Sequence, residues 1–195
     1  MRERGRRANE AIACLRHLWR DDNTPFIGRL FEVPTLRLNS PPVSPGGPPV
    51  WIGGRSDAAL RRAAKLGDGY LGFLLDAAGF TKRMEIIRGS AREAGRAAHH
   101  IAGALVSFMR VDTDRDRAVT EAAAVLSANY GQPMEAAMAR YGIVGDVGAC
   151  RKTLRTLEQV GVEHLVLVPV GRGAVFDTQL DRAAEVIAGL RECRA

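Results

Sequence analysis

The chain alternates between short apolar runs and stretches with helical periodicity. Four runs are almost entirely apolar, at 50–54, 69–75, 101–111 and 164–170. After each run, apolar residues recur every three or four positions, which predicts an amphipathic helix. Apolar strands that alternate with such helices are typical of a parallel sheet covered by helices. The pattern therefore predicts an α/β fold.

The helical periodicity begins before the first apolar run. Ile12, Leu15, Leu18 and Trp19 share one face of a helix predicted over 6–20. Apolar and polar residues alternate in part after this helix, which predicts a short hairpin. The other predicted elements are the hairpin at 26–39 and helices at 56–66, 80–95, from Asp114, 133–142, 146–161 and 178–193.

The number of strands leaves two architectures open. The chain has 195 residues, which suits one domain over 1–195 with a substantial core. An eight-stranded (β/α) barrel needs about 250 residues. Four core strands in this length are compatible with a small open α/β sheet or with part of a barrel.

The composition narrows the class of protein. Hydrophobic residues make up 46% and charged residues 26%, which is ordinary for a soluble protein. No apolar run reaches the roughly 18 residues of a membrane span, so we expect no membrane partner. Cys14, Cys150 and Cys193 are odd in number and far apart, which indicates a reducing compartment. We expect a cytoplasmic protein without a metal site.

The net charge of +6 does not change the expected class of protein or its partners. Most of the cations are arginines interleaved with Asp and Glu along the predicted helices. No nucleic-acid-binding motif accompanies them, so we expect a solvated arginine-rich surface and no nucleic acid partner.

The join between the first apolar run and its helix is the main candidate site. A helix start offers free N–H groups, and glycine lets an anion approach the backbone closely. Ser56 is the expected N-cap of this helix. The residues Ile52, Gly53, Gly54, Arg55 and Ser56 form either a cradle for a phosphate or a tight turn.

Three segments resemble one known family. "PPVWIGG" (48–54), "AALRRAAKLGDGYL" (58–71) and "LRTLEQVGVEHLVLVPV" (154–170) are similar to the C-terminal half of luciferase-like monooxygenases. That family comprises flavin- and deazaflavin-dependent oxidoreductases on a (β/α)₈ barrel of the TIM type. The resemblance implies a partial barrel in which the four apolar runs are strands five to eight. It also implies coenzyme F-420 or FMN as cofactor and a small-molecule substrate.

The resemblance also implies where the cofactor binds. It places the cofactor phosphate at the loop Ile52–Ser56 and beside Gly69, Tyr70 and Leu71. Asp68 is a candidate acid, although Asp-Gly is also ordinary turn chemistry. No catalytic residue is assigned.

Two further regions lie at predicted strand ends. Arg110 and Arg172 could meet an anion or could be solvated loop arginines. The segment 170–175 competes as a phosphate site, because barrels of this type often bind phosphate after strands seven and eight.

The resemblance implies that strands one to four are absent from the sequence. The chain would then supply the phosphate-binding half of an oxidoreductase or monooxygenase. The alternative is a non-catalytic half-barrel that binds an anion. An open half-barrel exposes sheet edges, so we expect a homo-oligomer or association with the missing half.

Overall fold

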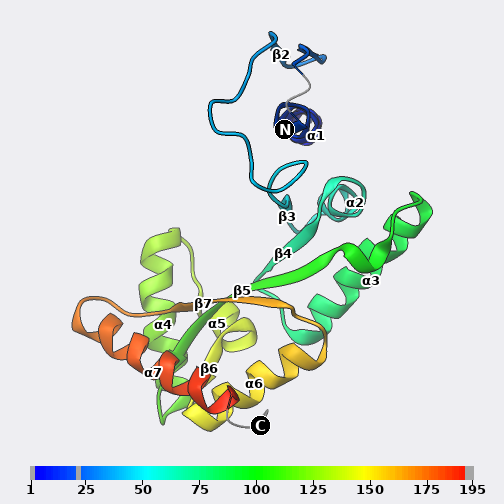
Figure 1. The fold of residues 1–195 in the computed structure, drawn as a ribbon. Helices are drawn as coiled ribbons and strands as arrows, with labels where there is room; N and C mark the ends of the chain where they lie inside the picture. The colour runs from blue at the N-terminus through cyan, green and yellow to red at the C-terminus, as the bar shows by residue number, and fades with distance from the viewer. Residues whose placement is uncertain (1–2, 21–22, 192–195) are drawn as a thin grey trace. The chain divides into compact units, whose positions relative to one another are not determined.

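The computed structural model describes residues 3–20 and 23–191. The chain divides into two compact units (Figure 1). The first unit contains the chain up to Tyr70 together with 85–102, and the second contains 71–84 and the chain from Gly103 onward. Strand β4, helix α3 and strand β5 contribute residues to both units. The elements that these two units share are β4 (Gly69–Phe73), α3 (Ala77–Glu93) and β5 (Ala102–Val111).

The first unit begins with the predicted helix and hairpin. The carboxylate of Glu10 accepts hydrogen bonds from the backbone N–H groups of Leu30 and Phe31, at 2.5 and 2.8 Å, and so fixes the hairpin turn to the first helix. Its elements are α1 (Glu3–Arg20), β1 (Phe26–Ile27), β2 (Glu32–Val33), β3 (Trp51–Gly53), α2 (Asp57–Leu66) and the 3₁₀ helix η1 (Ala98–His100).

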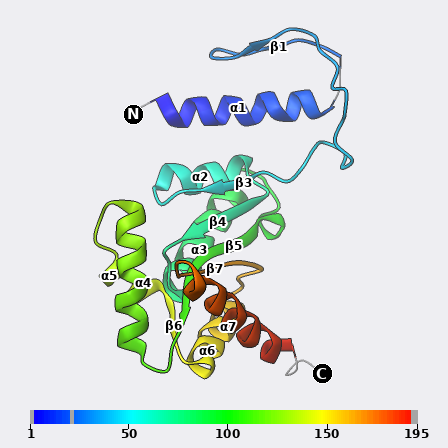
Figure 2. The same cartoon turned by 90° about the vertical axis from the view of Figure 1, so that its left-hand side faces the viewer.

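The second unit carries the rest of the sheet and four helices. Helices α6 and α7 lie side by side in both ribbon views (Figure 2). The Arg151 side chain of α6 donates hydrogen bonds to the backbone oxygens of Glu185 and Val186 on α7. The elements are α4 (Arg115–Tyr130), α5 (Glu135–Tyr141), β6 (Ile143–Gly145), α6 (Val147–Gln159), β7 (His164–Pro169) and α7 (Ala174–Arg191).

In the main sheet, strand β5 pairs in parallel with both β6 and β7. The strand order of this sheet is β3-β4-β5-β6, and β7 pairs with β5. Residues 104–109 of β5 pair in parallel with 164–169 of β7, and residues 109–111 pair in parallel with β6. The predicted α/β fold with a parallel sheet is confirmed.

Small residues let α4 pack closely on the second unit's sheet. Ala118 and Ala122 are completely buried, and Phe108 on β5 lies in the same apolar cluster. The rings of Phe73 and Phe108 meet edge to face, with centroids 5.6 Å apart. This core fixes the carboxyl end of β5, which is the strand end that carries Arg110.

The structure corrects the sequence predictions in three places. Leu15 was predicted to share one face of the first helix with Ile12, but Leu15 is 43% exposed, whereas Ile12 and Cys14 are buried. Strand β6 was not predicted, because three residues are too few to show a periodicity. The run at 164–170 was predicted to be a strand of a sheet covered by helices; the strand is present, but Val166 in β7 is 50% exposed.

Candidate functional site

The predicted cradle is a sharp loop between β3 and α2. Gly54 has a φ of +130°, a conformation that side chains rarely adopt. A Cβ atom added at Gly54 would lie 2.7 Å from the Cβ of Ala59, which is closer than real contacts allow. Glycine is therefore required here both by the backbone and by the approach of the helix.

The loop leaves backbone donors at the start of α2. Ser56 is the N-cap, as predicted: its Oγ accepts from the N–H of Ala59 at 3.3 Å. Its carbonyl oxygen accepts from Ala59 and Leu60. In the described part of the chain, the N–H groups of residues 55–58 have no acceptor. Such free groups carry the partial positive charge of a helix start.

One positive and one negative side chain lie next to these N–H donors in the sequence. Arg55 and Asp57 are exposed. Because their charges offset each other, the attraction for an anion comes from the backbone rather than from a net side-chain charge. The arrangement suits a phosphate group bound mainly by N–H groups.

The buried side chain of Tyr70 supports the loop between β3 and α2. Its hydroxyl donates a hydrogen bond to the carbonyl oxygen of Gly54 at 3.1 Å, and the side chain is only 1% exposed. The structure thus brings two predicted site residues together. The contact gives Tyr70 a role that the sequence did not suggest, namely fixing the orientation of the Gly54 peptide.

The other predicted residues lie elsewhere along β4. Gly69 lies against the indole of Trp51, and a Cβ atom there would overlap the ring. Leu71 is half-buried and belongs to the second unit. The role of Gly69 and Leu71 in cofactor binding stays a prediction.

Asp68 has structural partners. Its carboxylate accepts from the backbone N–H of Val50 at 2.8 Å and from the guanidinium of Arg16 at 2.9 Å. These contacts lie where β3 and β4 begin, whereas active sites of barrels lie where strands end. The geometry favours the interpretation of Asp68 as a turn residue.

The strand-end arginine Arg110 is not solvated, and its buried Nε has no hydrogen-bond partner among the described residues. It is 6% exposed, donates from Nη1 to the carbonyl oxygen of Val170 at 2.9 Å, and pairs through Nη2 with Glu121. The prediction of a solvated loop arginine is therefore wrong, because the core that α4 forms with β5 encloses it. The sequence spacing of Arg110 and Glu121 gives no signal for this pair, since it depends on how α4 packs.

The competing segment 170–175 is also a tight turn at the start of a helix. A Cβ atom added at Gly171 would lie 2.7 Å from the backbone nitrogen of Phe176, so this turn is tight. The N–H groups of Val175 and Phe176 donate to Arg172 and Gly173 within the turn. Arg172 itself donates to Asn129 at 3.4 Å. The N–H groups of residues 171–174 have no acceptor among the described residues, so the number of free donors does not distinguish this turn from the start of α2.

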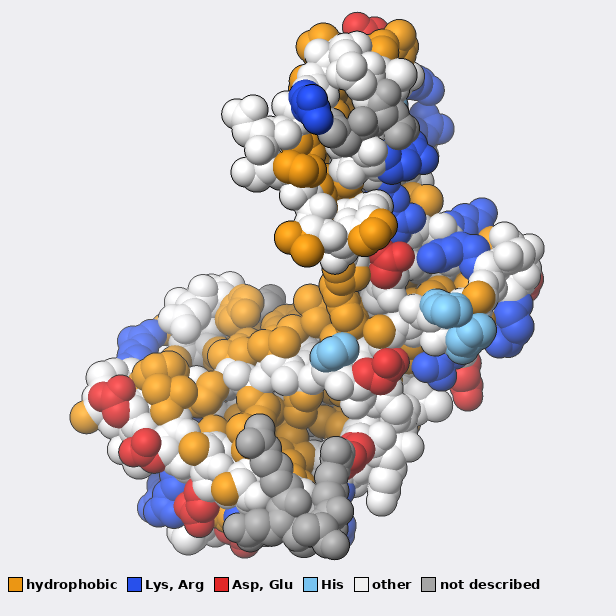
Figure 3. Space-filling view, viewed as in Figure 1, with side chains coloured by type: hydrophobic (Ala, Val, Ile, Leu, Met, Phe, Trp, Pro, Cys, Tyr) orange, Lys and Arg blue, Asp and Glu red, His pale blue; other side chains and the backbone are white. Residues whose placement is uncertain are grey.

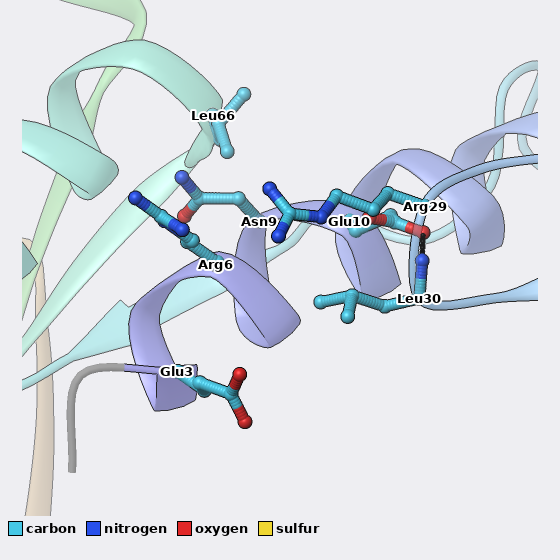
Figure 4. A pocket seen from close by; sticks show the side chains of 7 residues that line it. All are labelled: Glu3, Arg6, Asn9, Glu10, Arg29, Leu30 and Leu66. Atoms are coloured by element: carbon cyan, nitrogen blue, oxygen red, sulfur yellow. Dashed lines mark hydrogen bonds between the residues drawn. The ribbon is translucent and has the colours of Figure 1, made fainter.

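A separate pocket of about 450 Å³ lies in the first unit (Figure 4). Figure 4 shows Arg6, Glu10 and Arg29 around it, with Glu10 bonded to the N–H of Leu30. The pocket touches Leu66, the last residue of α2. It is thus about 15 Å from the helix start, given the 1.5 Å rise per residue. It is distinct from the predicted cradle.

Three ionisable groups in the second unit, Cys150, Asp112 and Arg117, have shifted pKa values. Burial raises the pKa of the Cys150 thiol to about 11, and the nearby Asp146 acts in the same direction. The hydrogen bond from Arg117 lowers the pKa of Asp112. Cys14 and Cys150 are buried free thiols, and Cys193 lies outside the described residues.

The described residues contain no group of His, Cys, Asp and Glu that could hold a metal ion. Within the same part of the chain, no helix has the length and apolar character needed to cross a membrane.

A parallel sheet covered by helices, with a glycine loop before the start of α2, defines this protein as an α/β protein. The family model of the luciferase-like monooxygenases matches residues 1–172. The chain therefore belongs to the luciferase-like monooxygenase family.

Individual relatives agree with this assignment. The 5,10-methylenetetrahydromethanopterin reductase of Archaeoglobus fulgidus is 28% identical over 150 residues, which cover 76% of this chain and 44% of that protein. The F420-dependent glucose-6-phosphate dehydrogenase of Nakamurella multipartita is 24% identical over 186 residues, covering 85% of this chain and 54% of that protein. The chain thus spans about half the length of these relatives.

A solved structure supports the fold. An F420-dependent secondary alcohol dehydrogenase in complex with an F420-acetone adduct superimposes with a TM-score of 0.79 at 18% identity. The match covers 95% of this chain and 62% of that chain. At this identity the likeness establishes the fold alone.

Proposed function

We propose that this chain supplies the cofactor-phosphate-binding part of an oxidoreductase that uses coenzyme F-420 or FMN. The observation that carries the proposal is the row of free N–H groups at residues 55–58, next to the side-chain-free Gly54. Both cofactors carry a phosphate on the chain attached to their ring. The phosphate would bind at the start of α2, as at other helix N-termini.

The residues of the loop have distinct tasks in this proposal. Gly54 leaves room for the phosphate and for Ala59, and Ser56 caps the helix so that its axis points at the anion. Tyr70 fixes the Gly54 peptide from the buried side. The bound cofactor would supply the redox chemistry, and the loop would hold its tail so that the ring is oriented.

The relatives favour the deazaflavin over FMN. The glucose-6-phosphate dehydrogenase relative is named as dependent on F420, and it matches 85% of the chain. The catalytic step and the small-molecule substrate belong to a complete enzyme of the family. For this chain they are proposals that rest on the family membership.

The test is a titration of the full chain with oxidised coenzyme F-420 and, separately, with FMN, following cofactor fluorescence. We expect saturable binding of at least one cofactor and competition by inorganic phosphate. Absence of binding of both at sub-millimolar concentrations would reject the proposal.

The alternative, a non-catalytic half-barrel that binds an anion, predicts a different outcome. In that case inorganic phosphate binds, but neither cofactor binds more tightly than phosphate alone. The comparison of the three dissociation constants separates the two functions.

A further inference from the structure

A pocket in the first unit is lined by Arg6 and Arg29, which belong to different elements of the chain. Arg6 comes from α1, and Arg29 comes from the turn between β1 and β2. Among the described residues, neither guanidinium group makes a hydrogen bond or an ion pair. The pocket volume of about 450 Å³ lies in the range of small-molecule sites. The pocket therefore combines room for a ligand with two cationic side chains.

Glu10 lines the same pocket but already has other partners. Its Oε1 accepts hydrogen bonds from the backbone N–H groups of Leu30 and Phe31, at 2.5 and 2.8 Å. A Cβ atom added at Gly28 would overlap this carboxylate, so glycine lets Glu10 reach the hairpin turn. The Glu10 carboxylate therefore stabilises the turn, and within the described part of the chain it pairs with no arginine.

Asn9 adds a neutral donor to the pocket. Its Oδ1 accepts a hydrogen bond from Nε of Arg62 on α2 at 2.6 Å, which leaves its NH₂ group as a donor. A Cβ atom added at Gly5 would lie 2.7 Å from Nη2 of Arg62, so glycine lets this arginine lie close to α1. Figure 4 shows the guanidinium groups of Arg6 and Arg29 on either side of Asn9. Donors from two arginines and one amide therefore line the same pocket.

Positive charge dominates the surface near the pocket. Figure 3 shows Lys and Arg side chains gathered over the part of the first unit that contains α1 and α2. Glu3, the other acid that lines the pocket, is turned away from the two arginines in Figure 4. A surface of one sign attracts ligands of the opposite sign. The pocket therefore favours an anion.

Two leucines give the pocket an apolar wall. Leu30 in the hairpin turn is 40% exposed, and Leu66 at the end of α2 is half-buried. Apolar side chains next to a few convergent polar groups are typical of small-molecule sites. A ligand with a short apolar part would remove the surface of these leucines from water, which is favourable. The wall therefore adds a second requirement to the anionic group.

We propose that this pocket binds a small molecule with a phosphate or carboxylate group and a short apolar part. We call it the α1–hairpin pocket (Arg6, Asn9, Arg29, Leu30 and Leu66). Guanidinium groups bind both kinds of anion through parallel hydrogen bonds, and the leucines would cover the apolar part. The inference does not depend on the proposed cofactor site, because the loop between β3 and α2 contributes no lining residue.

The test is a titration of the full chain with phenyl phosphate and, separately, with benzoate at constant ionic strength. The readout is the NMR signals of the arginine Nε–H groups, and we expect saturable shifts at Arg6 and Arg29 with at least one probe. Arg29→Gln should raise the dissociation constant at least about tenfold, because it removes a hydrogen bond to a charged group. Arg61→Gln, at an exposed position of α2 outside the pocket, is the matched control and should keep the affinity.

A further variant tests the apolar wall. Leu30→Ser should weaken the binding of phenyl phosphate, because less apolar surface is covered. The same variant should bind inorganic phosphate, a probe without an apolar part, as well as the wild type does. Circular dichroism identifies any variant that fails to fold. If Arg29→Gln is one of these, Arg6→Gln decides, because it removes the other guanidinium group of the pocket.

Three results would overturn the inference. The first is the absence of saturable shifts at Arg6 and Arg29 with both probes at millimolar concentrations. The second is an equal loss of affinity in Arg29→Gln and Arg61→Gln, which would mean that the anion responds only to the general surface charge. The third is a set of shifts confined to the backbone amides of residues 55–58, which would leave the proposed cofactor site supported and this pocket empty.

Discussion

The substitution Gly54→Ala should weaken binding of the cofactor phosphate. An alanine at a φ of +130° costs about 1–3 kcal/mol of backbone strain. Its Cβ would lie 2.7 Å from that of Ala59, whereas carbon atoms pack at about 3.5–4.0 Å. The loop must therefore move by roughly 1 Å away from the helix start.

A shift of this size is enough to break a hydrogen bond, because N–H···O distances span only about 2.7–3.2 Å. A hydrogen bond to a charged group is worth about 1.5–3 kcal/mol. Loss of one such bond raises the dissociation constant about 10- to 100-fold. The assay is the fluorescence titration of the variant with coenzyme F-420 and with FMN, next to urea unfolding for stability.

Gly46→Ala is the matched control for backbone strain. Gly46 also has a positive φ, of +80°, but no atom lies within 4 Å of its added Cβ. This variant should lose stability through strain and keep its affinity for the cofactor. The reasoning fails if folded Gly54→Ala binds as tightly as the wild type, or if Gly46→Ala loses as much affinity.

Three further predictions concern single contacts. Tyr70→Phe removes the bond to the Gly54 carbonyl oxygen and should lower the free energy of unfolding by about 1 kcal/mol in urea. Cys150 keeps its proton in the folded state up to a pKa of about 11, so stability should fall as pH rises from the ordinary thiol pKa toward 11. Cys150→Ala should lack that loss when urea midpoints are compared across this range. Arg117→Met should raise the pKa of Asp112, followed by carboxyl NMR; in the wild type, the lowered pKa contributes stability that is lost as pH falls through it. An unchanged pKa in Arg117→Met would show that the hydrogen bond is not its cause.

Features that depend on neighbours in sequence could be predicted. The N-cap at Ser56 and the end of the helix predicted over 146–161, where Gly161 has a φ of +86°, follow from local backbone chemistry. The glycine requirement at Gly54 was expected for the same reason. Each of these contacts joins residues that are only a few positions apart, so the local sequence is enough to predict it.

Features that depend on packing could not be predicted. Arg110 looks like any strand-end arginine in the sequence, yet it is buried against Val170 and Glu121. Its partners are sixty and eleven residues away, and only the packing of α4 on β5 brings them together. The contact between Tyr70 and Gly54 was missed similarly, since the side chain crosses from β4 to the end of β3.

The disagreement at Val166 is of a different kind. An uninterrupted apolar strand is favourable only if both of its faces are covered, which is why the sequence predicts a buried strand at 164–170. The structure places Val166 at 50% exposure, and Phe176, Leu180 and Ile187 on α7 are also exposed. The apolar pattern of β7 is therefore that of a strand in a complete barrel, where neighbouring elements cover both faces, whereas the described residues cover β7 only in part.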